Sequence, residues 1–453
     1  MNIIIAGNGK VGNTLARQLT EEGHDLTIIE MDKRVLDATI EQLDVMAIQG
    51  NCASMSVLKE AGVEEADLLI AVTNYDEVNL LCCMTAQGIN SDLHTIARIR
   101  NPDYTQQVAE MPGTFHLAMT VNPEKQAAQE LERLLKFPGF LRRDTFAKGR
   151  TEIVELRVDS KSKLCNVALI DLPNVVKCKI LVCAVLRNGQ ALVSNSGSFV
   201  LQEGDRIFVT APTANLALLL KNLGIITRRV RRVLLCGGDR IGWYLAKLLE
   251  KDNITVEILE NNEKRCRTLA EQLPQAEVIL GDCTNRDVLE SEDIADCDAV
   301  ITLTGLDEMN MIVSLYAASR GVPQVITKLG RGENSQLADS LELGSVICPR
   351  ELCSNNIVRY VRAMQNQTGA AVSVHSIADG KAEAVEFLVD ENTKNCGKPL
   401  KELKLKQGLV VAGITHGAKT EIPNGDSRFL PGDTVVMVTS GRGVLHQLND
   451  IFA

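Results

Sequence analysis

A glycine-rich turn near the N-terminus has the residue types and the spacing that bind a diphosphate. Gly7, Gly9 and Gly12 follow the apolar residues 3–6 and open a segment with helical periodicity. We expect Gly7 to allow a tight turn, Gly9 to let the backbone approach a pyrophosphate, and Gly12 to let the helix pack closely on the strand. The N–H groups and the dipole of the helix N-terminus would then face the phosphates.

An acidic residue at the expected distance after the glycine turn strengthens the prediction of a nucleotide site. Glu30 stands 18 positions after Gly12, at the end of the next apolar run. Its carboxylate can accept hydrogen bonds from the adenosine ribose and would repel a 2′-phosphate, which favours NAD(H) over NADP(H). Further residues are expected at the carboxyl ends of later strands, with Arg98 and Arg100 either binding phosphate or forming salt bridges. The first crevice is thus predicted to comprise Gly7, Asn8, Gly9, Lys10, Val11, Gly12, Glu30, Asn51, Cys52, Thr73, Asn74, Arg98 and Arg100.

The elements that position these residues alternate between strands and helices. Apolar runs at residues 26–30, 67–73 and 95–99 predict strands of a parallel, doubly wound α/β sheet. Pro123 opens a predicted helix that ends near residue 137. Short β-type runs then follow, separated by turns such as Asn188-Gly189, and predict a small α+β domain.

The chain repeats itself with a period of about 230 residues. Gly237 and Glu260 lie 230 positions after Gly7 and Glu30. "AVTNYDEVN" at residues 71–79 matches "TLTGLDEMN" at residues 302–310. We therefore predict a duplicated pair of domains, each pair a Rossmann-type sheet domain followed by a crossover helix and an α+β domain. The expected bounds are 1–121, 122–228, 229–347 and 348–453.

The second half departs from the glycine pattern. Asp239 stands where Gly9 stands in the first half, and Lys328 and Gly330 replace Arg98 and Arg100. A carboxylate about 5 Å from a phosphate costs roughly 3 kcal/mol at an effective dielectric near 20, unless its side chain points away. Whether this crevice binds NAD, ATP or ADP, or nothing, stays open. Its candidate residues are Gly237, Gly238, Asp239, Arg240, Ile241, Gly242, Glu260, Asp282, Cys283, Thr304 and Lys328.

Composition limits the other functions. The net charge of −10 argues against nucleic-acid binding, and no apolar run approaches the length of a membrane helix, so we expect a cytoplasmic protein. The scattered cysteines and histidines predict reduced core thiols and no metal site.

Two charged segments have alternative interpretations. Asp76 and Glu77 could bind a cation, but we expect them to be exposed acids of a turn. The basic residues 227–233 are expected to be a solvated linker, with contact to anionic lipid or an acidic partner as the alternative.

Over essentially its whole length, the chain resembles the bacterial Trk-type potassium-uptake regulatory family. The resemblance is carried by the duplicated order, "GNGKVG" with Glu30, "ARIRNPDY" at residues 97–104, and the "GD" turns of both C-terminal domains. It implies RCK (regulating conductance of potassium) domains that bind NAD(H) or ATP/ADP. It also implies that copies of the chain form a tetrameric ring under a membrane potassium channel subunit, at the inner face of the membrane. By the family motif, the nucleotide would lie against Gly7, Gly9, Gly12, Glu30, Asn51, Thr73 and Arg98.

The expected function is therefore that of a regulatory, nucleotide-binding subunit and not of an enzyme. An NAD-dependent dehydrogenase is the first alternative, because a cofactor fold does not fix function. It is disfavoured because the partner domain is small and no histidine recurs at matching positions in the two halves. A regulator of a different cation channel or antiporter is the second alternative.

Overall fold

The computed structural model describes the chain except residues 138, 161, 194–196, 225–229, 331–340, 342, 365–370, 379, 441–444, 446 and 453. Met1–Ala128 and Cys348–Tyr360 form one compact unit, and Gln129–Ile347 with Val361–Ala453 form another. Of the predicted basic linker, residues 227–229 lie outside the described part, so its role stays a prediction. Among the described helices, none has the length and hydropathy needed to cross a bilayer.

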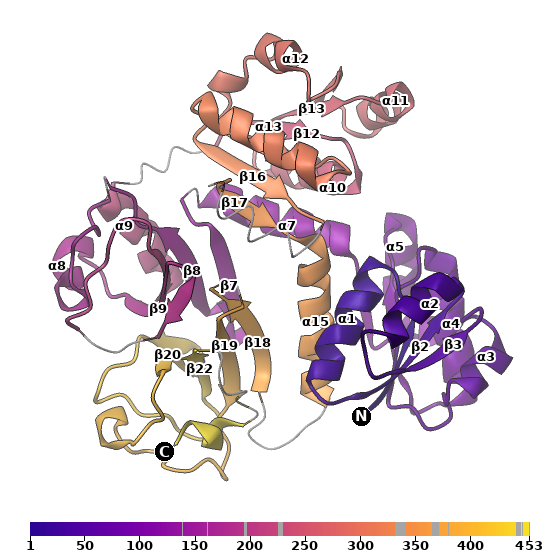
Figure 1. Cartoon of the computed structure of the whole chain (residues 1–453), viewed down its shortest axis with the longest axis horizontal. Helices are drawn as coiled ribbons and strands as arrows, with labels where there is room; N and C mark the ends of the chain where they lie inside the picture. Colours follow the sequence, from indigo (N-terminus) through magenta and orange to yellow (C-terminus); the bar gives the residue numbers. More distant parts are fainter. Residues whose placement is uncertain are drawn as a thin grey trace. The chain divides into compact units, whose positions relative to one another are not determined.

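The first unit is built on an all-parallel sheet of six strands in the order β3-β2-β1-β4-β5-β6. Figure 1 labels β2 and β3 of this sheet together with its helices α1 to α5. Ile3, Ile4 and Ile5 are all buried, as expected for a strand covered by helices on both faces. The strand order reverses between β1 and β4, and ligands of such sheets bind at the carboxyl ends of the strands beside this point. The elements are β1 (Asn2–Ala6), α1 (Lys10–Glu21), β2 (Asp25–Glu30), α2 (Lys33–Ile40), β3 (Met46–Gln49), α3 (Met55–Glu60), β4 (Leu68–Ala71), α4 (Asp76–Ile89), β5 (His94–Arg98), α5 (Pro102–Glu110), α6 (Pro112–Phe115) and β6 (Met119–Val121).

The second half repeats this sheet. Six parallel strands have the equivalent order β14-β13-β12-β15-β16-β17. Two doubly wound parallel sheets were predicted from the duplicated sequence, and this prediction is confirmed. The elements are β12 (Arg232–Cys236), α10 (Arg240–Lys251), β13 (Thr255–Glu260), α11 (Glu263–Gln272), β14 (Glu277–Leu280), α12 (Arg286–Ser291), β15 (Ala299–Thr302), α13 (Asp307–Ser319), β16 (Gln324–Lys328) and β17 (Ser345–Ile347).

Each parallel sheet is followed along the chain by an antiparallel sheet of five strands, in the orders β10-β9-β11-β8-β7 and β18-β19-β22-β20-β21. Asn188 and Gly189 both have positive φ, so they form the tight hairpin turn predicted between β9 and β10. The elements are β7 (Arg142–Phe146), β8 (Thr151–Arg157), α8 (Leu172–Val176), β9 (Leu181–Arg187), β10 (Gln190–Leu192), β11 (Arg206–Ala211), α9 (Thr213–Leu223), β18 (Ala371–Ile377), β19 (Ala382–Leu388), β20 (Leu409–His416), β21 (Lys419–Glu421) and β22 (Thr434–Thr439).

The two antiparallel sheets pack against each other through a shared apolar cluster that includes Phe146, Phe208 and Val436. Beside this cluster, His375 Nδ1 lies 2.9 Å from Asp144 Oδ1. Asp144 and His375 are 231 positions apart, so they are equivalent residues of the two repeats. The duplication has therefore allowed equivalent positions to become a complementary acid and base.

Two long helices, α7 (Pro123–Lys136) and α15 (Pro349–Met364), carry the chain from each parallel sheet to its antiparallel sheet. The first turns of α15 pack in the first unit, where Gln18 Nε2 donates to Asn355 Oδ1 at 3.4 Å. The last turn of α7 packs in the second unit, where Gln324 Nε2 donates to the Leu134 carbonyl at 2.9 Å. Each long helix thus contacts the parallel-sheet domain of the other half.

Candidate functional site

The glycine turn after β1 is as tight as its sequence predicts. Gly7 has a φ of +94°, and a Cβ built on it would lie 3.0 Å from Thr73 atoms. A Cβ on Gly12 would lie 2.0 Å from the Gly7 carbonyl oxygen. Both glycines are therefore required by packing, because any side chain would force the turn and helix α1 apart.

Gly9 has a different role, because packing does not require it. It is the N-cap of α1 with φ −68° and ψ −164°, a conformation open to any residue. A Cβ built here would meet nothing within 4 Å. In the described residues no side chain caps the first turn, where Lys10 is exposed and Val11 is buried. Because Gly9 has no side chain, no cap competes for the N–H groups of this turn, and a phosphate could bind them.

Glu30 is tied to the same turn. Its Oε2 accepts a hydrogen bond from the Asn8 N–H at 2.7 Å, and its Oε1 accepts from the Met31 and Asp32 N–H groups at 2.7 and 3.1 Å. These bonds fix the carboxylate beside the glycine turn. Each carboxylate oxygen accepts two hydrogen bonds, so Oε2 retains a lone pair for a ribose hydroxyl.

Arg98 ends β5 and is the most unusual residue of the crevice. The residue is 8% exposed, and its Nε has no hydrogen-bond partner in the described residues. Burial first, and then the neighbouring Arg100 cation, lower the pKa of Arg98. A buried guanidinium without a partner is costly. The Arg98 Nε–H therefore lacks a hydrogen-bond partner in the described residues, although the Glu124 and Asp76 carboxylates act on the guanidinium charge from nearby.

A buried asparagine links the backbone of Arg98 to Thr73, which packs on Gly7. Asn79 Oδ1 accepts from the Thr73 N–H and Oγ1 at 2.8 and 2.7 Å, and its Nδ2 donates to the Arg98 carbonyl at 2.9 Å. It thus links the loop after β4 to the end of β5. Sequence reasoning did not single out Asn79, although it ends the matched segment 71–79 and Asn310 ends its counterpart.

Arg100, predicted either to bind phosphate or to form a salt bridge, lies beside the Asp76 carboxylate. Its Nε lies 3.7 Å from Asp76 Oδ1, and its guanidinium donates to the Asn74 carbonyl. Asp76 is buried and accepts the N–H groups of Arg100 and Asn101 at 2.8 and 2.7 Å. The expectation that Asp76 is an exposed turn acid was therefore wrong, because its carboxylate satisfies backbone donors left over at the end of β5.

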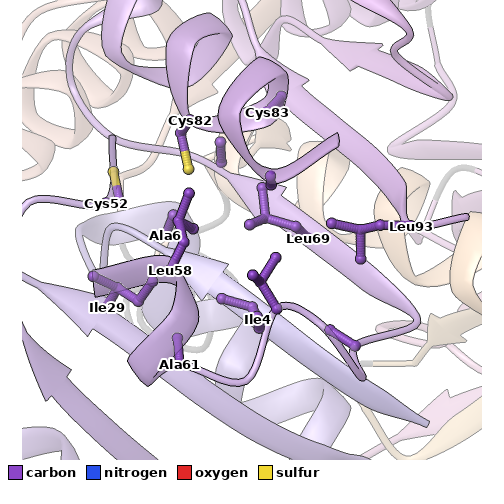
Figure 2. Close-up of a cluster of buried hydrophobic side chains, with 14 of the residues drawn as sticks. Ile4, Ala6, Ile29, Cys52, Leu58, Ala61, Leu69, Cys82, Cys83 and Leu93 are labelled. Atoms are coloured by element: carbon purple, nitrogen blue, oxygen red, sulfur yellow. The ribbon is translucent and has the colours of Figure 1, made fainter. Parts of the chain in front are cut away.

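Asn51 and Cys52, the predicted crevice residues that follow β3, differ in exposure. Asn51 is exposed, and its Oδ1 accepts the Ala53 N–H at 3.0 Å. Cys52 is buried in the core with Ala6 and Cys82 (Figure 2). Only the backbone of Cys52 is therefore able to face a ligand.

The second half reproduces this scaffold. Gly237 has a φ of +119°, and Glu260 Oε2 accepts the Gly238 N–H at 2.9 Å. Asn310 Oδ1 accepts the Thr304 N–H at 2.9 Å, and its Nδ2 donates to the Lys328 carbonyl at 2.9 Å. The turn, the acidic residue and the strand end are therefore arranged as in the first half.

The side chain at the N-cap is what differs. Asp239 Oδ1 accepts the Ile241 and Gly242 N–H groups at 2.9 and 3.2 Å, and its Oδ2 lies 2.9 Å from Lys328 Nζ. The Asp239 carboxylate therefore covers the N-terminus of its own helix instead of pointing away. Because Lys328 is equivalent to Arg98, this contact also shows that a side chain at the end of this strand reaches the helix N-cap.

The side chains of the remaining predicted residues of the second half differ in exposure. Arg240 is exposed and Ile241 is buried. Asp282 is exposed, and its Oδ1 accepts from the N–H and Oγ1 of Thr284 at 2.9 and 2.8 Å. Cys283 packs in the core, as Cys52 does.

Comparisons of the sequence find the same duplication. The TrkA-N domain family model matches residues 3–118 and 233–349, and the TrkA-C domain model matches residues 153–224 and 384–453. The Trk system potassium uptake protein TrkA homolog of Archaeoglobus fulgidus is 34% identical, over 94% of both chains. The Trk system potassium uptake protein TrkA of Halomonas elongata is 30% identical, over 100% of this chain and 98% of its own.

Solved structures show the same fold. The RCK domain of GsuK matches 97% of this chain and 92% of its own with a TM-score of 0.62 and 15% identity. The GsuK channel bound to NAD matches 97% of this chain and 76% of its own with a TM-score of 0.61 and 17% identity. At these identities, the likeness establishes a tandem RCK fold.

Proposed function

The chain belongs to the TrkA family of Trk-system potassium uptake proteins, and on this basis we propose that it is a nucleotide-sensing regulatory subunit of a membrane potassium transporter. The observation that carries the nucleotide part is Arg98. Its buried guanidinium stands at the carboxyl end of β5, the strand next to β4 at the switch point, and lacks a partner for Nε in the described residues. A diphosphate between Arg98 and the first turn of α1 would supply that partner.

The chemistry of the crevice favours an adenine nucleotide with a diphosphate. The N–H groups of α1 and Arg98 bind anionic oxygens, and Glu30 accepts from the ribose. NAD(H) fits because the Glu30 carboxylate repels a 2′-phosphate, and ATP or ADP would present the same adenosine and diphosphate. GsuK has been solved with NAD and with ADP, which supports this ligand class.

Regulation then requires only that the nucleotide prefers one of two states of the protein. A ligand shifts such an equilibrium by its differential affinity for the two states. Coupling of this kind is typically about 1–3 kcal/mol, equivalent to roughly 5- to 150-fold in affinity. The nucleotide would thus change potassium flux through the partner without being consumed.

Exposed apolar side chains support assembly with further copies of the chain. Tyr75, Leu81 and Met84 are exposed on or beside α4. The equivalent positions on or beside α13 are also apolar and exposed, and they are Leu306, Ile312 and Leu315. Apolar residues repeated at matched positions indicate a reused contact surface. These residues support self-association, and we propose that the assembly is a tetrameric ring beneath the membrane subunit, on the cytoplasmic side.

The direct test is potassium uptake into vesicles that contain the membrane subunit and the full-length chain. NADH, NAD, ATP and ADP are added separately, and NADH absorbance is followed in parallel. We expect the flux to change by roughly 5- to 150-fold with at least one nucleotide, while NADH absorbance stays constant.

Arg98→Gln is the informative variant, because it keeps a polar side chain but removes the cation. It should abolish the response, whereas Arg267→Gln, at an exposed pair on α11, should retain it. A full nucleotide response in Arg98→Gln would contradict the proposal, and so would turnover of NADH.

A further inference from the structure

We infer that the second glycine turn carries its own anion, Asp239, so that the intact chain binds one nucleotide, through its first half. This inference rests on the function proposed for the first half. It answers the question, left open by the sequence, of whether the second half binds NAD, ATP or ADP, or nothing.

The Asp239 carboxylate bonds to both the backbone N–H groups and the cation that a diphosphate would need. One carboxylate oxygen accepts the Ile241 and Gly242 N–H groups of the first turn of α10. The other lies 2.9 Å from Lys328 Nζ, which also donates to the Leu303 carbonyl at 2.8 Å. The N-terminal donors and the strand-end cation are therefore already bonded to a negative charge of the chain.

Entry of a diphosphate would require this carboxylate to leave. The ligand would have to replace two backbone hydrogen bonds and an ion pair, and the displaced charge would stay covalently attached at the N-cap. There it would repel the phosphates. The Asp239 side chain is 41% exposed, so these three contacts, and not burial, hold its carboxylate at the helix N-terminus.

The first half has the same donors and cation without the carboxylate. Gly9 and Asp239 have almost the same backbone, with φ −68° and −69° and ψ −164° and −173°. A Cβ on Gly9 would meet nothing within 4 Å, so an aspartate fits there and would face Arg98 as Asp239 faces Lys328. One side chain thus decides whether each crevice is filled by the chain or by a ligand.

The test is the number of ADP molecules bound per full-length chain, measured by calorimetry and repeated with NADH. The variants are Gly9→Asp and Asp239→Gly, alone and combined. Glycine is itself an accepted N-cap residue, and Asp239→Asn serves as a second variant that keeps a capping side chain without its charge. Thermal melts check that each variant folds.

We expect one nucleotide for the natural chain, none for Gly9→Asp, two for Asp239→Gly, and one for the combined variant. Two nucleotides in the natural chain would overturn the inference while leaving the proposed function intact. One nucleotide in folded Asp239→Gly and Asp239→Asn would also overturn it. A natural chain that binds no nucleotide would contradict the proposed function. The Asp239→Gly variant would then still test the inference: one nucleotide bound to this variant would support it, and none would overturn it.

Discussion

The two parallel sheets of this chain share a strand order, a glycine turn, an acidic residue at the end of the second strand and a buried asparagine. They differ in how charge is balanced at the helix N-cap. In the first half Arg98 is buried and its Nε lacks a protein partner in the described residues. In the second half Lys328 pairs with Asp239. A duplicated fold can therefore keep one copy ready for an anionic ligand while the other copy supplies that anion itself.

The largest expected effect comes from giving the first half the residue of the second. In Gly9→Asp, the new carboxylate should bind the first turn of α1 and Arg98, and so compete with a diphosphate. We expect ADP affinity to fall by at least about 100-fold, or roughly 2.7 kcal/mol, in calorimetric titration of the full-length chain. Gly88→Asp, at an open position on α4, is the control. Unchanged affinity in Gly9→Asp would break the comparison.

The buried asparagines test whether the two halves share one scaffold. Asn79→Ala leaves the Thr73 N–H and the Arg98 carbonyl without partners, and Asn310→Ala does the same for Thr304 and Lys328. Each should lower the free energy of unfolding by about 2 kcal/mol, measured by denaturant titration. Only Asn79→Ala should also weaken ADP binding. Equal losses of ADP affinity in both variants would argue against a difference between the halves.

Asp144 and His375 extend the comparison to the antiparallel sheets. Burial alone would raise the pKa of Asp144, but the Arg142 guanidinium and His375 outweigh it and hold the pKa at about 2. Because this pKa lies below the ordinary value of 3.8, the stabilisation is complete above pH 3.8 and is lost as the pH falls through 2.

The predicted contribution of this carboxylate is about 2 kcal/mol. Unfolding free energies of the natural chain and Asp144→Asn, measured between neutral and acidic pH, should converge at low pH. A constant difference across that range would show that the charge of Asp144 is not responsible.

The smallest effect concerns stability in nucleotide-free buffer. Arg98→Met removes a buried charge and should raise the free energy of unfolding by about 1 kcal/mol. Lys328→Met instead breaks a formed ion pair and should leave stability unchanged or lower it by up to about 1 kcal/mol. Thermal melts would measure both, and a loss of stability in Arg98→Met would show that Arg98 already has a partner within the chain.

Much of this arrangement could be predicted from the sequence. The offsets between Gly7 and Gly237 and between Glu30 and Glu260 predicted two equivalent sheets, because strand and helix periodicity recur with them. The turn geometry of Gly7 and Gly12 followed from the glycine pattern, since its cause is local.

What could not be predicted depends on contacts between distant segments. The sequence raised the clash of Asp239 with a phosphate, but not its pairing with Lys328, which lies 89 positions away. The sequence also predicted Asp76 to be an exposed acid of a turn, because only the folded sheet brings the Arg100 and Asn101 N–H groups to its carboxylate. The packing of α15 in the first unit was missed for the same reason.

The most direct test of the account is a crystal structure of the full-length chain soaked with ADP. We predict the diphosphate between the first turn of α1 and the Arg98 guanidinium, the ribose on Glu30, and the Asp239–Lys328 pair unchanged. A diphosphate bound at α10 with Asp239 displaced, or ADP bound elsewhere with Arg98 uninvolved, would contradict it.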